Sequence, residues 1–231
     1  MESFSVLAII AALILSYLIG AIPVGWIIVK LFTGRDVRKV ESGRTGGTNV
    51  MRAAGFVAGA LTAIGDVAKG FSTSLIVAWL LPADVPIKVW LQVAAPLAAI
   101  LGHNYSIYLI ERRADGTLKL RGGAGGATCF GGAISLWPWS GAFILPIAAV
   151  VFLLVGYASM TTLSIAVSAT AICAYLAIAY GSPWEHVVYG VISLLILGWA
   201  LRPNLVRLAN GTERAVGLRA YLAKRKAAAK N

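Results

Sequence analysis

Residues 4–32 read FSVLAIIAALILSYLIGAIPVGWIIVKLF and contain one charged side chain, Lys30. A helix of about 20 apolar residues crosses the roughly 30 Å hydrocarbon core of a bilayer, so this run is long enough to span it. It is also too long for the apolar core of a secretory signal, and the charged residue before it is the acidic Glu2. We therefore expect the run to remain in the mature protein as a transmembrane helix.

The rest of the chain has the same apolar character. Of its 231 residues, 59% are hydrophobic and 13% are charged, which lies outside the range of soluble globular domains. Lipid cannot hydrogen-bond backbone groups, so the spans must be helices. The fold class is therefore expected to be all-α, a polytopic membrane protein with seven transmembrane helices over residues 4–32, 57–81, 86–110, 128–137, 139–156, 161–180 and 184–201.

The basic residues mark one side of the membrane. Seventeen of the twenty Lys and Arg residues lie in segments 33–55 and 111–122 and in the tail from Arg202. Loops rich in Lys and Arg stay in the cytoplasm, so we expect the amino terminus outside and the carboxyl terminus inside, with an odd number of spans. Because spans interrupt the basic residues, the net charge of +11 does not indicate nucleic-acid binding. The opposite side receives Glu2, Asp84, Lys88 and Glu185.

This topology predicts two parts in the chain. Residues 1–203 form the transmembrane domain, with cytoplasmic glycine-rich loops at 33–55 and 111–127. Residues 204–231 form a basic cytoplasmic tail, which either lies as an amphipathic helix on anionic headgroups or is disordered. Cys129 and Cys173 lack the paired spacing of zinc sites and disulfide frameworks, so we interpret them as packing residues and expect no metal and no cofactor.

The first glycine-rich loop has the composition of an anion site. Residues 42–49 read SGRTGGTN, and Arg52 follows one turn later. Glycines let backbone N–H groups turn towards phosphate oxygens, hydroxyls add donors, and arginine adds charge. The alternative is a flexible loop without a ligand. The candidate phosphate-binding residues here are Gly43, Thr45, Gly46, Gly47, Thr48, Asn49 and Arg52, and Ser42 is a candidate catalytic residue.

The second glycine-rich loop, residues 121–128 with the sequence RGGAGGAT, runs directly into the next apolar helix. Its backbone amides would lie at the amino-terminal end of that helix, which carries partial positive charge and where phosphates bind. The alternative is close helix packing through small residues. Two such loops on the same face favour a shared phosphate site, to which this loop would contribute Gly122, Gly123, Gly125, Gly126 and Thr128.

Three ionisable residues of the second and third spans are candidates for function. Asp66 and Lys69 share one face of the second span, where charge is costly and is either functional or part of a mutually neutralising structural pair. His103 lies in the cytoplasmic half of the third span, where it either orients a substrate, acts as a base, or serves as a hydrogen-bonded structural histidine.

A further polar cluster follows the last span. Pro203 is expected to turn the chain away from the membrane. The cluster is then either a solvated tail or a third wall of the phosphate site, and its position on the face of both glycine-rich loops favours the wall. Its members are Asn204, Arg207 and Glu213.

These stretches, in this order, resemble the bacterial acyl-phosphate:glycerol-3-phosphate acyltransferase family, the PlsY type, over nearly the whole chain. The first motif of that family, S-G-N-x-G-A-T-N with the continuation N-V-x-R-x-x-G, matches here at Ser42, Gly43, Gly46, Thr48, Asn49, Arg52 and Gly55. Further similarity lies in SYLIGAIP at 16–23, in Asp66, Lys69 and Gly70, in Gly102 and His103, and in Asn204, Arg207, Leu208, Gly211 and Glu213.

The chain departs from the family pattern at two positions that bear on phosphate binding. The second motif, G-G-K-G-x-A-T, has lysine where this chain has Ala124, and the third, H-R-x-N, has histidine where this chain has Leu201. An insertion also lies around residues 111–117. Arg121 or Lys119 are candidates to compensate in charge, although an arginine does not reproduce a lysine's point contact.

The resemblance implies transfer of a fatty acyl group from acyl phosphate to the 1-hydroxyl of glycerol 3-phosphate, which forms lysophosphatidic acid in phospholipid biosynthesis. It implies a multi-pass protein of the bacterial inner membrane with a cytoplasmic active face. The implied partners are acyl phosphate, glycerol 3-phosphate, membrane lipid and a soluble or peripheral enzyme that makes acyl phosphate. The candidate residues for orienting the attacking hydroxyl are Ser42, Lys69, His103 and Asn204. The competing hypothesis is a transport-type or catalytically silent membrane protein that binds lipid phosphates.

Overall fold

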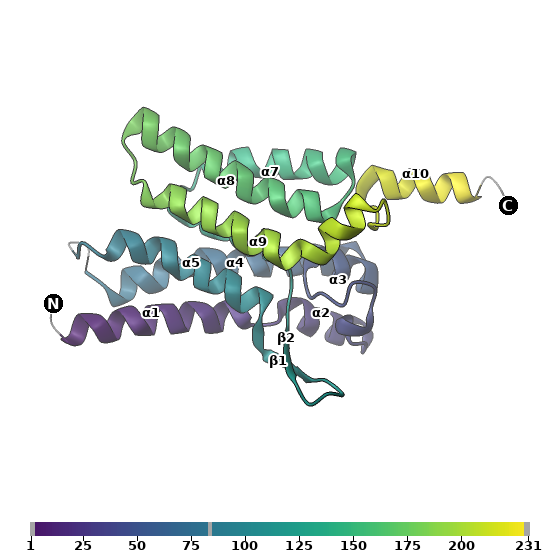
Figure 1. Cartoon of the computed structure of the whole chain (residues 1–231), viewed down its shortest axis with the longest axis horizontal. Coiled ribbons are helices and arrows are strands. Elements are labelled where there is room, and N and C mark those ends of the chain that lie inside the picture. Colours follow the sequence, from purple (N-terminus) through teal and green to yellow (C-terminus); the bar gives the residue numbers. More distant parts are fainter. Residues whose placement is uncertain (1–2, 83–84, 229–231) are drawn as a thin grey trace.

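The computed structural model describes residues 3–82 and 85–228, so Glu2, Asp84 and the last three residues of the expected tail lie outside it. The described residues form helices and one β-hairpin (Figure 1). The elements are α1 (Ser3–Ala21), α2 (Val24–Thr33), η1 (Val37–Lys39), α3 (Gly47–Ala54), α4 (Phe56–Leu80), α5 (Lys88–Asn104), β1 (Ser106–Arg112), β2 (Leu118–Arg121), α6 (Gly126–Leu136), α7 (Ser140–Val150), η2 (Val151–Val155), α8 (Ala158–Tyr180), α9 (Glu185–Ala209) and α10 (Gly217–Ala228).

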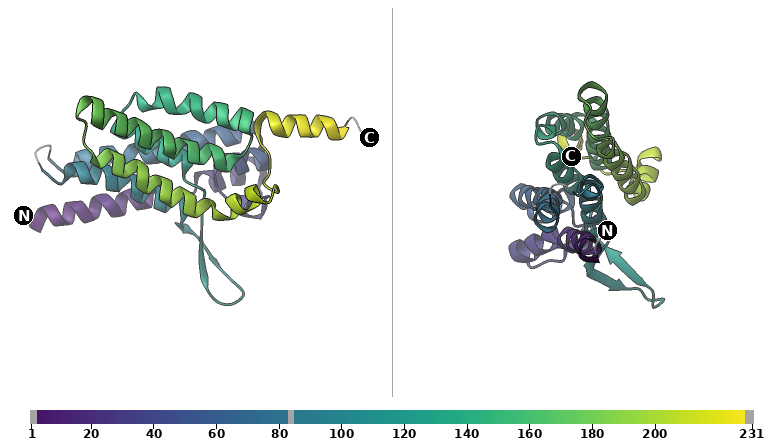
Figure 2. Two further views of the ribbon diagram at one scale, coloured as in Figure 1. Left: turned by 45° about the horizontal axis from the view of Figure 1, so that its top comes forward. Right: turned by 90° about the vertical axis from the view of Figure 1, so that its left-hand side faces the viewer.

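The long helices form two groups that lie against each other along the long axis of the molecule (Figures 1 and 2). One group holds α1, α4 and α5, and the other holds α7, α8 and α9. Helix α6 joins the groups, since it contacts α4 and α5 on one side and α8 and α9 on the other. The short helices α2 and α3, the hairpin and α10 gather at one end of this bundle (Figure 1).

Glycines allow the closest helix contacts. A Cβ atom on Gly20 of α1 would lie 2.3 Å from the carbonyl oxygen of Ala99 in α5. On Gly70 of α4 it would lie 2.0 Å from that of Thr128 in α6, and on Gly131 of α6 2.0 Å from that of Val67. In lipid, helices associate through such close packing because the hydrophobic effect does not drive them together.

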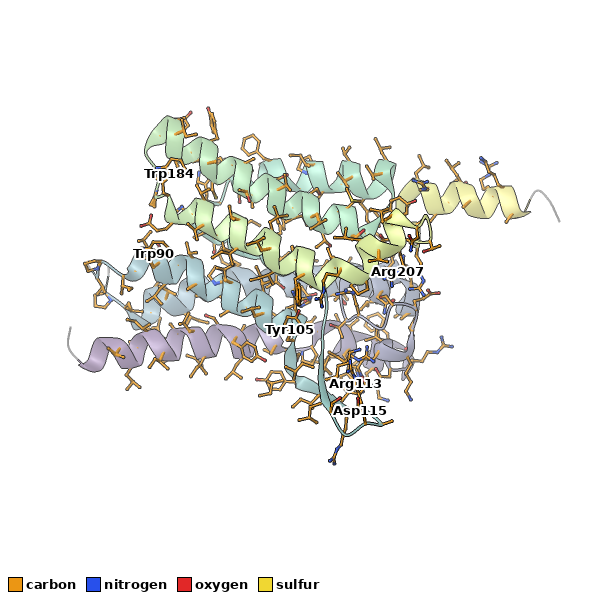
Figure 3. The ribbon with its side chains drawn as sticks, in the orientation of Figure 1. Trp90, Tyr105, Arg113, Asp115, Trp184 and Arg207 are labelled. Atoms are coloured by element: carbon orange, nitrogen blue, oxygen red, sulfur yellow. The ribbon has the colours of Figure 1, made fainter. Side chains whose placement is uncertain are left out.

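The outer surface and the two ends of the bundle suit a membrane. Four helical segments are long and apolar enough to cross one: Val6–Thr33, Phe56–Leu80, Ala158–Tyr180 and Glu185–Ala209. Exposed tryptophans such as Trp90 and Trp184 lie at the end opposite α10 (Figure 3), as in the aromatic belts of membrane proteins. The count of seven spans and the sides of the two termini stay predictions.

Two expected helix boundaries differ in the structure. The run at 4–32 is interrupted between α1 and α2, where Pro23 lacks a backbone N–H. The third span ends at Asn104 instead of residue 110, because Ser106–Arg112 pairs antiparallel with Leu118–Arg121. The insertion at 111–117 is thus the tip of a hairpin that projects from the bundle (Figure 1), and the expected all-α fold contains this two-stranded element.

The last span also differs from expectation, because Pro203 does not turn the chain. It lies inside α9, which continues to Ala209, so the expected boundary at 203 and 204 falls within a helix. Neighbouring helices can satisfy the carbonyl that a proline leaves free. The tail then turns and forms α10, and the backbone N–H of Val216 donates to the carbonyl of Gly156 (2.9 Å).

Candidate phosphate site

The two glycine-rich loops meet. The backbone N–H of Thr45 donates to the carbonyl of Gly122 (3.2 Å), and the Arg44 guanidinium donates to the carbonyl of Gly123 (3.1 Å). The convergence predicted from their composition is therefore present in the structure. Residues far apart in the chain share one site at the end of the bundle that carries α3 and the hairpin (Figure 1).

Two helices begin at the cavity that the loops enclose. The cavity has a volume of about 630 Å³, and its wall includes Gly46 and Gly47 at the start of α3 and Gly125 and Gly126 at the start of α6. The first N–H groups of a helix have no partner within the helix and carry its partial positive charge. Both helix starts therefore favour an anion in the same space.

Asn49 fixes the shape of the first loop. Its side chain is 3% exposed, and its nitrogen lies 2.8 Å from the carbonyl oxygen of Arg44 and 3.0 Å from that of Val40. Its oxygen accepts from the backbone N–H of Ser42 (3.4 Å). Asn49 thus organises the backbone that surrounds the cavity and, like Ser42 and Thr48, is one of its lining residues.

A buried charged cluster lies beneath the cavity. The Lys69 ammonium is 2.8 Å from a carboxylate oxygen of Asp66, 3.1 Å from Nδ1 of His103 and 2.9 Å from the carbonyl oxygen of Ile22. All three side chains are nearly inaccessible, with exposed fractions between 2% and 6%. Asp66 and His103 touch the cavity, whereas Lys69 is not among its lining residues.

The second loop is built around His103. The backbone N–H of Gly123 donates to the carbonyl of His103 (3.0 Å), and a Cβ atom on Gly123 would lie 2.0 Å from Nε2 of the imidazole. Gly125, the residue before α6, has a φ of +89°, which a side chain would strain. Glycine at these positions therefore lets the loop pack directly on the histidine.

The end of α9 and the turn after it form a third wall. The Glu213 carboxylate accepts from Nδ2 of Asn204 (3.0 Å) and from the hydroxyl of Ser159 (2.8 Å). Arg207 also lines the cavity, and Figure 3 shows it near the end of α9. The third wall expected from the sequence is thus part of the cavity.

Arginines give the cavity an excess of positive charge. Four line it, and the ion pairs among the described residues include Arg214, which pairs with Glu41, but not Arg44, Arg52 or Arg207. Burial lowers the pKa of Arg44 and of Arg52 from their ordinary values, because the charged form loses hydration. A guanidinium keeps its proton in proteins, so these side chains make the wall of the cavity favourable for an anion.

The candidate residues divide by their place relative to the cavity. Those that line it are Ser42, Gly46, Gly47, Thr48, Asn49, Arg52, Asp66, His103, Gly125, Gly126, Asn204, Arg207 and Glu213. Those that are not among its lining residues are Gly43, Thr45, Lys69, Gly122, Gly123 and Thr128. The polar residues Arg44, Ser159 and Arg214 line it too and were not among the candidates.

The rest of the cavity wall is apolar. It includes side chains from α4, α6, α7, η2 and α8, namely Ile64, Phe130, Leu145, Phe152 and Ile165. The space thus joins a cationic, amide-rich end to a hydrocarbon-like wall, as an anionic headgroup with an attached chain requires. Within the described ranges, no three His, Cys, Asp or Glu side chains gather to hold a metal ion.

Comparisons with known proteins agree on one family. The profile of the glycerol-3-phosphate acyltransferase family matches residues 10–211. A glycerol-3-phosphate acyltransferase of Thermus thermophilus is 38% identical over 209 residues, which is 90% of this chain and 95% of the relative.

Solved structures agree as well. The glycerol 3-phosphate form of PlsY (YgiH), an integral membrane glycerol 3-phosphate acyltransferase, superposes with a TM-score of 0.75 at 29% identity, over 93% of this chain and 98% of that one. Its lysophosphatidic acid form gives 0.74 at 27% identity, with the same coverage.

Proposed function

The chain belongs to the glycerol-3-phosphate acyltransferase family, and on that premise we propose that it transfers a fatty acyl group from acyl phosphate to the 1-hydroxyl of glycerol 3-phosphate. The product is lysophosphatidic acid. The reaction takes place at the cytoplasmic face of a bacterial inner membrane, where an enzyme that makes acyl phosphate delivers the donor.

The observation that carries this proposal is the single cavity with a cationic end and an apolar wall. Both substrates are phosphate anions, and that space is lined by both helix starts and by Arg44, Arg52 and Arg207. The donor also carries an acyl chain, for which the wall of α4, α6 and α8 provides apolar contact. A soluble pocket for a small anion would not need that second surface.

The chemistry requires positioning more than activation. The 1-hydroxyl oxygen attacks the acyl carbonyl carbon, the bond from that carbon to the phosphate oxygen breaks, and inorganic phosphate leaves with the electron pair and takes up the hydroxyl proton. Acyl phosphate is already activated, so holding the two reactants together supplies much of the rate. The helix starts and the arginines stabilise the charge on the departing phosphate.

Individual residues have different roles in this scheme. Ser42 and Asn204 line the cavity and orient the attacking hydroxyl, and Arg52 and Arg207 bind phosphate. Lys69 acts as a positioning residue, since its ammonium already contacts Asp66, His103 and a backbone carbonyl. His103 presents its ring to the cavity from that cluster.

The test is direct. Purified protein in detergent micelles is incubated with radiolabelled glycerol 3-phosphate and either palmitoyl phosphate or palmitoyl-coenzyme A, and lysophosphatidic acid is separated by thin-layer chromatography. We expect product from the acyl phosphate only. Product from the thioester alone would reject the donor assignment, and no product from either donor would reject acyl transfer.

One observation favours a second candidate, a catalytically silent or transport-type protein that binds lipid phosphates. Ala124 and Leu201, which stand where the family motifs have a lysine and a histidine, both line the cavity. Their side chains bring neither charge nor a proton carrier. If neither donor gives product while lysophosphatidic acid still raises the thermal unfolding midpoint, this candidate replaces the first.

A further inference from the structure

Arg44 lies where three separate segments meet. It belongs to the first loop, and its guanidinium donates to the carbonyl of Gly123 in the second loop (3.1 Å) and to the carbonyl of Ala200 in α9. It also lies 3.4 Å from the side-chain oxygen of Asn204. One side chain therefore joins all three walls of the cavity.

All three partners of Arg44 are neutral oxygens. Ion pairs formed by the described residues do not include it. Burial and the nearby Arg207 lower its pKa, while the Glu213 carboxylate acts in the opposite direction without contacting it. Its three contacts occupy three of the five N–H donors of a guanidinium, so two remain for an anion. A negative ligand in the cavity would offset the cost of burying this charge.

The contacts of Arg44 place its charge beside both substituted positions. Gly123 and Ala200, whose carbonyls it binds, immediately precede Ala124 and Leu201 in the chain. Arg44 itself stands where the first family motif, S-G-N-x-G-A-T-N, has asparagine. Three departures from the motifs, far apart in sequence, thus gather around one guanidinium.

The other basic residues considered from the sequence do not fill this place. The Arg121 guanidinium pairs with the Glu111 carboxylate on the hairpin (2.5 Å), and neither Arg121 nor Lys119 is among the residues that line the cavity. The compensating charge therefore comes from the first loop and not from the strand next to the second.

We propose that Arg44 is a phosphate-binding residue of this chain, with its guanidinium supplying the positive charge that a lysine at position 124 would bring. The inference rests on the proposed function and adds one residue to it. The free Nε–H and the second N–H of Nη1 each donate a single hydrogen bond to a phosphate oxygen, while the other three donors tie the loops to α9. Arg44 thus serves both to bind substrate and to close the site.

An exchange of residues tests the proposal. Arg44→Asn removes the charge, and we expect the KM for acyl phosphate or for glycerol 3-phosphate to rise about 10- to 100-fold, as for loss of a hydrogen bond to a charged group. The double variant Arg44→Asn/Ala124→Lys returns a cation from the opposite loop and should recover at least half of that loss on a logarithmic scale. Arg113→Asn, which removes an arginine at the hairpin tip away from the cavity (Figure 3), is the matched control and should match wild type.

The outcomes are separable. Unchanged KM values in Arg44→Asn, or no recovery in the double variant, overturn the role of Arg44 while wild-type turnover leaves the proposed function standing. If wild type itself makes no product, the proposed function fails. Arg44 is then tested separately, by comparing how far inorganic phosphate raises the unfolding midpoint of wild type and of Arg44→Asn. Should Arg44→Asn not fold, Arg44→Lys takes its place. If inorganic phosphate raises the unfolding midpoint of Arg44→Lys at a concentration within about tenfold of that needed for wild type, the role of the Arg44 charge is supported. If phosphate no longer raises the midpoint, that role is overturned.

Discussion

The backbone N–H of Thr45 donates a hydrogen bond of 3.2 Å to the carbonyl of Gly122 and so joins two loops that lie on either side of α4 and α5 in the chain. This contact, with that of Arg44 to Gly123, makes the starts of α3 and α6 face one cavity. An anion held there interacts with both helix dipoles at once.

Arg52 binds a substrate phosphate in the proposed scheme, since it lines the cavity without an ion-pair partner among the described residues. Arg52→Ala should raise the KM for a phosphate substrate about 10- to 100-fold with a smaller change in protein yield. The KM of Arg52→Lys should fall between those of wild type and Arg52→Ala, because an ammonium keeps the charge but lacks the planar arrangement of N–H donors. Steady-state kinetics with each substrate varied in turn measures the effect. KM values equal to wild type in Arg52→Ala would remove this residue from the site.

Lys69 is expected to act through structure. Lys69→Met leaves the buried Asp66 carboxylate without its ammonium partner, which costs about 3–5 kcal/mol for a buried pair. We expect a clear fall in the thermal unfolding midpoint in detergent. Lys30→Met is the control, since Lys30 is on α2 with its exposed ammonium bonded to the carbonyl of Gly34, and that change should be small. A Lys69→Met protein as stable as wild type but inactive would instead indicate direct contact with substrate.

Gly123 packs on the His103 ring, and Gly198 of α9 offers a matched control that does not line the cavity. A methyl group on Gly123 would collide with the His103 ring, whereas the position it would take on Gly198 has no packing neighbour within 4 Å among the described residues. Gly123→Ala should therefore displace the imidazole and lower kcat at least about tenfold, and Gly198→Ala should keep wild-type kinetics. The comparison needs both proteins at equal purity and with a single unfolding transition. Equal activity in both variants would show that the second loop moves aside without cost.

We predict that the stability of the protein depends on pH through Asp36, which precedes the first loop. Its hydrogen bonds from the Arg38 side chain lower the carboxyl pKa from 3.8 to about 2. Because the folded-state pKa is lowered, the stabilisation is fully present above about pH 3.8 and is lost as the pH falls through about 2. Asp36→Asn should reduce stability by less than about 1 kcal/mol at pH 7, since water still reaches part of both side chains and screens the pair.

The measurement is the difference in unfolding midpoint between wild type and Asp36→Asn, at pH 7, pH 5 and pH 2.5. We expect equal differences at the first two values and a smaller one at the third. A difference that does not change with pH would show that the carboxylate charge plays no part.

Much of the site could be predicted from the sequence, since the signals are local. The density of glycine and hydroxyl residues at 42–49 and 121–128 indicated two anion-binding loops, and thirteen of the nineteen candidate residues line the cavity. The family resemblance drawn from these motifs is confirmed by the comparisons. Arg44 was missed because its motif position has asparagine in the family. The available signal was a pair of changes from the family motifs: an arginine replaces asparagine at position 44, and an alanine replaces lysine at position 124.

Membrane character and the polar composition of the loops were determined by the sequence alone, because hydropathy and backbone freedom depend on which residues follow one another. Only the tertiary structure decided that Pro203 lies within a helix, that Ser106–Arg112 forms a strand, and that Lys69 is enclosed while Arg44 reaches the cavity. Those outcomes depend on which neighbours satisfy a freed carbonyl or a buried charge. Such neighbours come from distant parts of the chain and become known only when the helices pack.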